Sequence, residues 1–569
     1  MIAALRRFLG IGERRSITAS LNDTLELCVG RRPAGKVRAR GRIGRRRVAV
    51  VERTPGEGDQ PPPNALHVLL DELVPSLSMR QRAQLFDLVQ SAVLDDLSRP
   101  GSAMLAGNLL LLRNRLREPL PEPSGAPAAP QRLIVDNLFG ADERTFWVFG
   151  WCRDDDGALA AAEIVSPEGQ RAKLLDGAYR FPRRDVEEEF AATGIGTTVK
   201  HGFANLIELP HPSPLVDGWL AELRGSAVDF ELSLPAAIRD PVTIRAHVLA
   251  ESANERPDID VLRRDHARPA LDRLQAHVRR SIAIEEVVQH GEPPPSPEVS
   301  VIVPLYGRTD LVEHQIAQFW NDPDMAAAEL IYVLDSPELG NQLTHEAALL
   351  HDLYGLPFKV VRVNRNGGYA TANNLGVTQA RGRLIVLVNS DVIPDRPGWL
   401  SHMREFHDAT PDVGAVGPKL LFEDESIQHA GMYFHFEHRT NLWENQHYFK
   451  GFSRTLEAAA VSRPVPAVTG ACLMVDRELY QRVGGLHEGY VQGGYEDSDL
   501  CLRLIDAGKR NWYLADVELY HLEAQSLPIE VRHANRYNAW LQTHLWSDQI
   551  AQLMVAQPDL PQAEVAALD

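Results

Sequence analysis

The sequence predicts an α/β protein whose C-terminal part is built on a mixed, mainly parallel sheet, preceded by a β-sandwich-like domain and a small helical region. Three patterns indicate this. From residue 298 onward, apolar strand-like runs alternate with helical segments, which is typical of a parallel α/β sheet. Over 132–255, short β-prone runs are separated by frequent turns. Over 61–131, apolar residues recur with helical spacing before a linker rich in Pro and Ala.

A chain of 569 residues is expected to hold about three or four domains. We expect the following order: 1–60, a basic segment that is partly disordered or a small β unit; 61–131, the helical region and linker; 132–255, the β-sandwich-like accessory domain; 256–297, a connecting helix and a Pro-rich hinge; 298–548, the α/β domain; and 549–569, a C-terminal tail.

Within the accessory segment, runs at 146–151, 162–165, 230–234 and 242–249 are apolar and β-prone, so we expect a strand at each. Apolar residues from Leu271 to Ile282 then repeat with helical period and mark the connecting helix.

The charge distribution limits the partners. A net charge of −18 argues against general nucleic-acid binding. Residues 1–53 differ, with fourteen basic residues against four acidic ones. This segment is either a solvated arm or, together with Leu5, Phe8 and Leu9, a contact for an anionic membrane surface.

The cysteine content and hydropathy favour the cytoplasm. Four scattered cysteines without metal-ligand spacing do not form a disulfide scaffold. No run of 18 apolar residues is present, and Met1–Gly10 lacks the features of a signal peptide. We therefore expect a cytoplasmic protein that could associate peripherally with the inner face of the membrane through its basic N-terminus.

The strongest local signal lies at 384–391, where the apolar run Leu-Ile-Val-Leu-Val ends in Asn389-Ser390-Asp391. A buried parallel strand delivers a carboxylate in this way to the edge of the sheet at which α/β folds bind ligands. Three earlier strands also end in polar loops, at Pro304, at Asp335 and before the glycine-rich segment 366–376. Glycines there would let backbone N–H groups approach a diphosphate.

The order of these features resembles glycosyltransferase family 2, whose members have the GT-A fold, a Rossmann-like mixed sheet, and use nucleotide-diphosphate sugars. The segments that carry the resemblance are 301–306, 366–376, 387–394, 469–485, 495–504 and 520–526. The resemblance implies that Pro304, Tyr306 and Asp335 line a nucleoside pocket. It also implies that Gly368 and Asn374 pack the donor nucleotide and its sugar.

The resemblance further implies a metal site. Asn389-Ser390-Asp391 matches the Asp-x-Asp motif of the family, with Asp391 as the metal-binding carboxylate and all three residues at the donor. His521 falls where many members supply a further metal contact. Oxygen ligands and one imidazole suit Mn²⁺ or Mg²⁺. Asn389 departs from the family pattern, since an amide gives the cation less charge compensation than a carboxylate.

Catalytic and acceptor residues are carried over in the same way. Glu496-Asp497 resembles the catalytic pair of the family, with Asp497 as the base that takes a proton from the acceptor hydroxyl. Gly470 and Ala471 resemble the segment beneath the acceptor, and His429 is expected near the acceptor. A cation can neutralise a diphosphate leaving group, so one metal and one base suffice, and we expect inversion at the anomeric carbon.

The implied function is transfer of a sugar from a UDP- or dTDP-sugar to a hydroxyl of a glycan or lipid-linked acceptor, in bacterial surface polysaccharide synthesis. Simpler interpretations remain: acids at 496–499 could cap a helix, and Asp335 or His521 could be structural. An inactive GT-A domain that serves as a binding or scaffold protein is the alternative function, and a nucleotidyltransferase is a weaker third.

Overall fold

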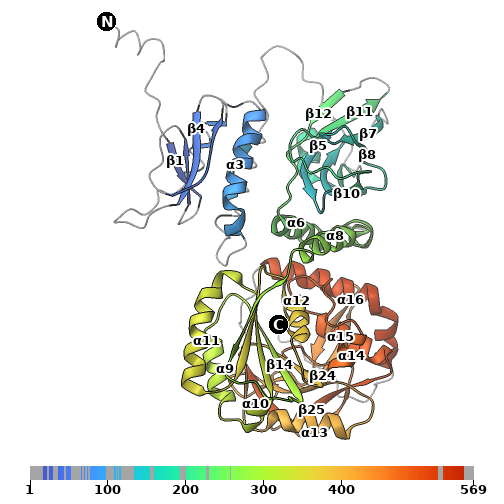
Figure 1. The fold of residues 1–569 in the computed structure, drawn as a ribbon. Helices are drawn as coiled ribbons and strands as arrows, with labels where there is room; N and C mark the ends of the chain where they lie inside the picture. The colour runs from blue at the N-terminus through green and yellow to red at the C-terminus, as the bar shows by residue number, and fades with distance from the viewer. Residues whose placement is uncertain are drawn as a thin grey trace. The chain divides into compact units, whose positions relative to one another are not determined.

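The computed structural model describes residues 17–21, 25–29, 36–43, 46–52, 79–97, 133–153, 159–191, 200–225, 230–254, 256, 258–522 and 529–555, with isolated positions between 66 and 116. The chain divides into two compact units (Figure 1). The N-terminal unit comprises Met1–Val248 with Arg256–Leu274, and the C-terminal unit comprises Leu249–Glu255 with Gln275–Asp569. Leu5, Phe8 and Leu9, the residues of the expected membrane contact, lie outside the described residues.

The basic N-terminal segment contains an antiparallel four-stranded sheet. Its strands, in the order β1-β2-β4-β3, are β1 (Ile17–Ser20), β2 (Leu25–Val29), β4 (Arg46–Glu52) and β3 (Lys36–Ile43). Helix α3 (Met79–Leu97) shares one apolar core with this sheet, in which Leu27, Val50, Leu85 and Val89 are fully buried. This core explains why apolar residues recur with helical period along α3.

Two further four-stranded sheets form a sandwich. One contains β5 (Leu133–Gly140), β6 (Thr145–Cys152), β10 (Gly202–Glu208) and β9 (Tyr179–Phe181); the other contains β12 (Phe230–Ser233), β11 (Leu220–Gly225), β7 (Leu159–Val165) and β8 (Arg171–Lys173). Phe146 and Val148 from the first sheet pack in one core with Ile164 and Ala221 from the second. Two sheets that share a core in this way define the β-sandwich architecture.

The strand expected at 242–249 is wrong, because this segment lies in helix α6 (Pro241–Ala253). The local capping chemistry accounts for the difference. Asp240 Oδ2 accepts a 2.7 Å hydrogen bond from the Thr243 N–H, which caps the helix, and Pro241 suits its first turn. Ile244 and Val248, one helical turn apart, are both fully buried. Helices α5 (Arg184–Ala191), α7 (Ile259–Leu262) and α8 (Arg268–Arg279) are the other α-helices between 184 and 279 among the described residues.

The C-terminal unit is built on an eleven-stranded mixed sheet with the main order β13-β16-β15-β14-β17-β24-β19-β25-β18. The strands are β13 (Ile284–His290), β14 (Val299–Leu305), β15 (Glu329–Leu334), β16 (Phe358–Val363), β17 (Leu384–Val388), β18 (Val392–Pro394), β19 (Val413–Leu421), β20 (Ile427–His429), β23 (Arg463–Val465), β24 (Cys472–Asp476) and β25 (Arg510–His521). Strands β16, β15, β14 and β17 pair in parallel, and β24 joins them antiparallel. The α/β class with a mixed sheet is therefore confirmed.

Helices cover both faces of this sheet (Figure 1). One apolar core includes residues of α12 (Tyr369–Thr378), α15 (Glu496–Asp506) and α16 (Ile529–Val555). The other includes residues of α9 (Leu311–Phe319), α11 (Gly340–Tyr354) and α13 (Trp399–Ala409). Strand β14 supplies Ile302 to the first core and Val301 and Val303 to the second, so alternate side chains anchor opposite layers. Short helices α10 (Pro323–Ala327) and α14 (Arg477–Arg482) and the hairpin β21 (Met432–Glu437)–β22 (Leu442–His447) complete the unit.

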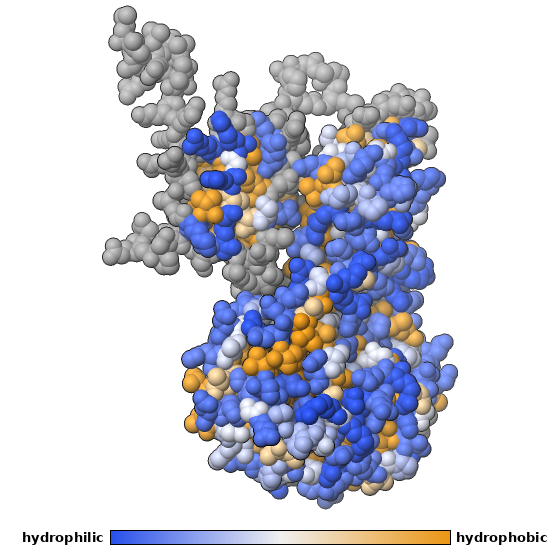
Figure 2. Space-filling view, viewed as in Figure 1, coloured by the Kyte–Doolittle hydropathy of each residue, from blue (hydrophilic) through white to orange (hydrophobic). Residues whose placement is uncertain are grey.

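The visible face of the C-terminal unit is mostly polar. In Figure 2, hydrophilic side chains cover most of the visible face of the C-terminal unit, and apolar side chains gather only in smaller areas. Among the described helices, none combines the length and the apolar character needed to cross a membrane.

Candidate active site

The expected metal residues meet at the edge of the sheet. Strand β17 ends at Val388, the chain turns through Asn389-Ser390-Asp391, and β18 then pairs antiparallel with β25, which places Val392 opposite His521. Asp391 Oδ1 consequently lies 3.3 Å from His521 Nε2. Ser390 is half-buried within the turn.

Gln428, on β20, orients the imidazole, and the sequence reasoning missed it. Its Oε1 lies 2.6 Å from His521 Nδ1, and its Nε2 donates to the His521 carbonyl oxygen at 3.3 Å. An amide oxygen can only accept, so Nδ1 carries a proton and Nε2 is the ring nitrogen that faces Asp391. A hydrogen bond of this kind fixes the orientation of a ring that is to ligate a metal through its other nitrogen. No sequence motif marks Gln428, because its partner lies 93 residues away.

These donors fit a hard divalent cation. A carboxylate oxygen and an imidazole nitrogen converge, and nearby Asn389 Oδ1 is a buried oxygen that has no hydrogen-bond partner among the described residues. Within the described part of the chain, no group of three or more His, Cys, Asp or Glu side chains could hold a metal. A cation at Asp391 and His521 would therefore need further oxygen ligands from water and substrate phosphates, as Mg²⁺ commonly takes.

The expected catalytic pair opens helix α15. Asp497 Oδ2 accepts from the Gly470 N–H at 2.8 Å, and its Oδ1 accepts from the Ser498 N–H at 2.7 Å. Glu496 is buried, and its Oε2 has no partner among the described residues. Burial and then the neighbouring Asp497 charge raise the pKa of Glu496 to about 7. Burial also raises the pKa of Asp497, but the two N–H donors oppose that shift and favour its ionised form.

The segment at Gly470 and Ala471 connects the two centres. The Ala471 carbonyl oxygen accepts from the Asn389 N–H at 2.9 Å, while the Gly470 N–H reaches Asp497. A side chain at Gly470 would lie 3.0 Å from the Tyr369 hydroxyl oxygen, which already donates to the Gly470 carbonyl oxygen at 2.7 Å. Two adjacent residues thus tie the end of β17 to the start of α15.

Asp335 holds the glycine-rich loop. The carboxylate is almost fully buried; its Oδ1 accepts from the Gly367 N–H at 2.7 Å and its Oδ2 from the Gly368 N–H at 2.8 Å. Burial raises its pKa to about 7. Gly368 has a φ of +81°, which favours glycine. Contact of Asp335 with a nucleoside stays a prediction; its observed role is to fix this loop.

The two other residues expected to line the nucleoside pocket, Tyr306 and Pro304, differ in solvent exposure. The Tyr306 side chain is 63% exposed in the loop after β14, so its ring is accessible for stacking. Pro304 is only half-buried although it lies within β14. Both remain predicted donor contacts.

Asn374, expected to contact the donor, instead forms hydrogen bonds with residues of the 480–488 segment. Its Oδ1 accepts from the Tyr480 hydroxyl at 2.6 Å and from the Leu486 N–H at 3.0 Å. Its Nδ2 donates to the Leu486 carbonyl oxygen and to Glu488 Oε1, both at 2.9 Å. The amide therefore has no donor hydrogen to spare, and the structure supports a role in joining α12 to the 480–488 segment rather than in binding a sugar.

The acceptor role expected for His429 is not supported. Its side chain is fully buried, with Nδ1 3.0 Å from the Pro418 carbonyl oxygen and Nε2 accepting from the Thr469 N–H at 3.3 Å. Burial lowers the pKa of His429 to about 4, so the ring is neutral. His429 instead supports the Thr469–Gly470 backbone from beneath.

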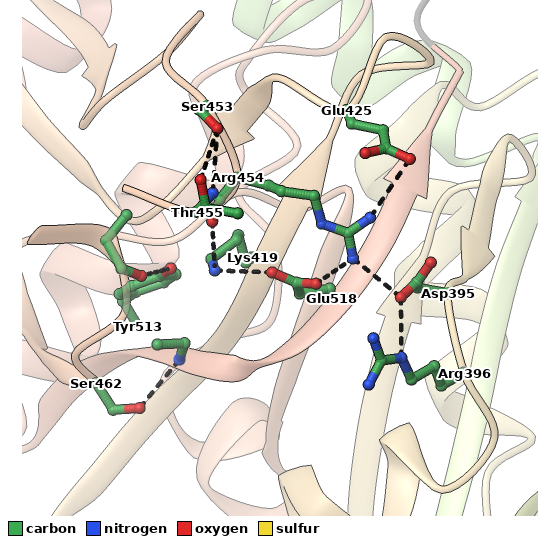
Figure 3. A network of polar contacts seen from close by, with 12 residues as sticks. Asp395, Arg396, Lys419, Glu425, Ser453, Arg454, Thr455, Ser462, Tyr513 and Glu518 are labelled. Atoms are coloured by element: carbon green, nitrogen blue, oxygen red, sulfur yellow. Dashed lines mark hydrogen bonds and ion pairs between the residues drawn. The ribbon is translucent and has the colours of Figure 1, made fainter. Parts of the chain in front are cut away.

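An ion-pair network, which the sequence did not indicate, links strand β25 to the residue that follows β18 (Figure 3). Glu518 on β25 pairs with Lys419 at 2.8 Å and with Arg454, and Arg454 reaches Asp395 at 3.1 Å. Asp395 directly follows β18, and its N–H donates to the Glu518 carbonyl oxygen. Burial opposes ionisation of Glu518, but hydrogen bonds from Lys419 and Arg454 outweigh it and lower its pKa.

Comparison with known proteins concerns the C-terminal domain as a whole. Residues 294–539 match the family described as "Glycosyltransferase like family 2". An uncharacterized protein, y4gI, of Sinorhizobium fredii is 38% identical over 172 residues, which cover 30% of this chain and 18% of that protein. The O-antigen biosynthesis protein RfbC of Myxococcus xanthus is 28% identical over 235 residues, covering 41% of this chain and 18% of RfbC. A crystal structure of GalNAc-T7 with UDP, GalNAc and Mn²⁺ aligns with a TM-score of 0.35 at 14% identity, over 47% of this chain and 52% of that one.

Residues 294–539 therefore match a glycosyltransferase family 2 domain, and the family expected from the sequence is confirmed for these residues. The match supports the expected enzyme class, glycosyltransferase, which is a proposal for the protein as a whole. The chain spans about a fifth of the length of the two relatives described above.

Proposed function

We propose that the protein is an inverting glycosyltransferase that moves a sugar from a nucleotide-diphosphate donor to an acceptor hydroxyl. One observation carries the proposal. Asp391 and His521 converge at one end of a two-hydrogen-bond connection, through Asn389–Ala471 and Gly470–Asp497, and the Asp497 carboxylate lies at the other end. This connection supports the proposal, because it would join a cation-binding pair to a base through one short backbone segment.

In this proposal each residue has a separate task. Asp391 and His521 hold a divalent cation, which supplies charge neutralisation to the departing diphosphate when it is bound. Asp497 accepts the proton of the acceptor hydroxyl as the oxygen attacks the anomeric carbon. Burial raises the pKa of Glu496 and favours its protonated form, which limits charge repulsion on Asp497. The diphosphate of the donor is proposed to lie beside Asp391 and His521, because the Gly367 and Gly368 N–H groups, expected to approach it, already donate to Asp335.

The proposed substrates are supported by the family and by the relatives. A UDP- or dTDP-sugar is the proposed donor, and a glycan or lipid-linked molecule of the cell surface is the proposed acceptor. The relative named for O-antigen biosynthesis supports a surface glycan. We place the reaction at the cytoplasmic face of the membrane, with the basic N-terminal segment as a peripheral contact.

A donor screen tests the proposal. Purified protein is incubated with a panel of nucleotide sugars and Mn²⁺, Mg²⁺ or EDTA, and release of nucleoside diphosphate is measured with and without membrane extract as acceptor. We expect release from one donor, lost in EDTA and in Asp391→Ala. Asp516→Ala is the matched control, because Asp516 is exposed on the same strand as His521.

A binding or scaffold protein is the second candidate, and Asn389 favours it because an amide replaces the first carboxylate of the family motif. The same screen separates the two functions. Nucleotide binding by calorimetry without turnover of any donor would contradict the enzyme and support the scaffold.

A further inference from the structure

The backbone before the catalytic pair is unusual. Four consecutive residues, Gln492, Gly493, Gly494 and Tyr495, have positive φ angles of 61°, 97°, 96° and 78°. Only two of them are glycines, so the conformation of Gln492 and Tyr495 is unfavourable in itself. Such a run persists only when surrounding groups hold it, and it determines where α15 begins and hence where Glu496 and Asp497 lie.

One side chain of α16 holds this run. Asn538 is fully buried, and its Nδ2 lies 3.0 Å from the Val491 carbonyl oxygen, 3.2 Å from that of Gly493 and 3.0 Å from that of Gly494. Its Oδ1 accepts from the Val491 N–H at 2.9 Å. The two Nδ2 hydrogens are shared among three carbonyl oxygens and Oδ1 accepts one N–H, so a single amide contacts four backbone groups of 491–494.

The next two turns of α16 continue the contact. Gln542, also fully buried, accepts from the Ser498 hydroxyl at 2.6 Å and donates to Asn445 Oδ1 at 3.0 Å. Trp546 Nε1 donates to Asp499 Oδ1 at 2.8 Å. The spacing of 538, 542 and 546 puts all three side chains on one face of the helix. They contact residues on both sides of the catalytic pair, at 491–494 and at 498–499.

We propose that this polar face of α16 is a positioning device for the base, with Asn538 and Gln542 as positioning residues that set the location of Asp497 without contacting the substrate. The inference rests on the proposed function, because it assigns these residues a role in the reaction. None of the hydrogen bonds of Asn538 or Gln542 goes to Asp391, to His521 or to the Gly367-Gly368 loop. Donor binding and catalysis should therefore respond differently when these contacts are removed.

The variants Asn538→Leu and Asn538→Asp test the proposal. Leu removes all four hydrogen bonds, and Asp keeps the shape but replaces the amide donor with a second acceptor. We expect kcat to fall on the order of 100-fold, the scale expected when a catalytic group is displaced by about 1 Å. The Kd for UDP with Mn²⁺, measured by calorimetry, should change less than about 3-fold. Gln542→Met should give a smaller loss of the same kind, and Gln542→Glu, which keeps the acceptor for Ser498, should restore part of it.

Gln549→Leu is the matched control. Gln549 also donates from α16 to a backbone carbonyl oxygen, that of Leu502, but its partner lies beyond the catalytic pair. Its kcat should stay within about 3-fold of wild type. Equal losses in kcat and in UDP affinity, or an unchanged kcat in both Asn538 variants, would overturn the proposal.

Hydrogen exchange separates the failure of this proposal from the failure of the proposed function. Amides of 491–499 should exchange faster in Asn538→Leu than in wild type, while those of β14 and β17 keep their protection. Unchanged exchange at 491–499 would overturn the positioning role even in an active enzyme. If the wild type transfers no sugar while exchange rises, the helix still orders this segment, but its catalytic role fails together with the proposed function.

Discussion

Asp497 accepts hydrogen bonds from two backbone N–H groups, those of Gly470 and Ser498, which favour its ionised form against the burial that raises its pKa. Its neighbour Glu496 has no such donors on Oε2 and is more deeply buried. Two adjacent carboxyls therefore have different environments, which separates their tasks. Similar separation is the usual sign of an acid–base assignment.

The first prediction concerns Asp497. Asp497→Asn keeps the shape and one acceptor oxygen but cannot take a proton from the acceptor hydroxyl. We expect the transfer rate to fall about 10²–10⁴-fold, the usual contribution of general-base catalysis. The Kd for UDP with Mn²⁺ should be little changed, because Asp497 does not belong to the metal pair. Turnover close to wild type would remove Asp497 as the base.

A second prediction concerns pH and stability. The pKa of Glu496 is raised from 4.5 to about 7 on folding, so the folded protein binds more protons than the unfolded chain between these values. The free energy of unfolding should therefore fall as pH rises from about 4.5 to about 7. Glu496→Gln should remove this component and stabilise the protein at pH 8, by an amount on the order of 3 kcal/mol at most.

Urea titrations of the C-terminal transition at pH 5 and pH 8 measure this effect. Glu518 provides a comparison of opposite sign, since its pKa is lowered and its contribution is lost as pH falls. A Glu496→Gln variant that shows the same pH dependence as wild type would show that Glu496 is ionised in the folded protein throughout this range.

For single residues, the sequence indicated which side chains are candidates for the site, but it did not indicate their hydrogen-bond partners. The apolar run before Asp391 and the strand that ends at His521 bring these two side chains to 3.3 Å of each other, and their metal role stays a prediction. Asn374 and His429 occupy the expected stretches of chain, yet their hydrogen bonds go to Leu486 and to Pro418, choices that depend on long-range packing. A motif identifies a residue in the sequence, but it does not predict which distant polar group becomes the hydrogen-bond partner of that residue.

At the scale of elements, the short edge strand β18 determines how Asp391 and His521 face each other. It contains three residues and pairs only with β25 within the main sheet order, so its hydrogen bonds alone fix the register of Val392 opposite His521 weakly. The ion-pair network around Glu518 joins β25 to β19, to Arg454 and to the residue after β18 (Figure 3). This network compensates for the few hydrogen bonds of the strand.

The third prediction tests that network. Glu518→Gln leaves the buried Lys419 ammonium and the Arg454 guanidinium without their shared carboxylate. We expect a loss of about 2 kcal/mol in the free energy of unfolding, below the range for fully buried pairs because Glu518 is partly exposed. Mn²⁺ affinity should also weaken, since His521 lies on the same strand. Denaturant titration and Mn²⁺ titration by electron paramagnetic resonance measure the two effects.

Glu298→Gln serves as its control. Glu298 pairs with Arg383 at 3.4 Å, but both side chains are largely exposed, so the loss should stay within about 0.5 kcal/mol. Equal effects of the two substitutions would show that the network adds nothing beyond a surface ion pair.

Whether a segment forms a helix or a strand could be predicted from its own sequence only where capping residues were considered together with apolar content. At 242–249 the apolar content suggested a strand, although Asp240, Pro241 and Thr243 form a helix start at the beginning of this segment. The strands of the parallel half of the sheet, by contrast, were expected correctly, because each is a short apolar run that ends in a polar loop. The pairing of β18 with β25 and the polar face of α16 could not be predicted, since both depend on which distant segments pack together.

The whole molecule consists of two compact units with separate apolar cores. All residues of the proposed active site belong to the C-terminal unit, including the pair Asp391 and His521, the base Asp497 and the positioning residue Asn538. Units with separate cores commonly unfold in separate steps, so a single two-state description does not apply. A ligand that binds one unit should then stabilise only that unit.

The last prediction follows from this division. Scanning calorimetry of the full chain should show more than one thermal transition, and UDP with Mn²⁺ should raise only one of them. At a ligand concentration about 100 times the Kd, linkage gives about 2.7 kcal/mol of added stability for the unit that binds. Asp391→Ala should abolish the shift and leave the other transitions in place. A ligand that moved every transition together would mean that the units unfold cooperatively, and the accessory unit would then contribute directly to the stability of the catalytic one.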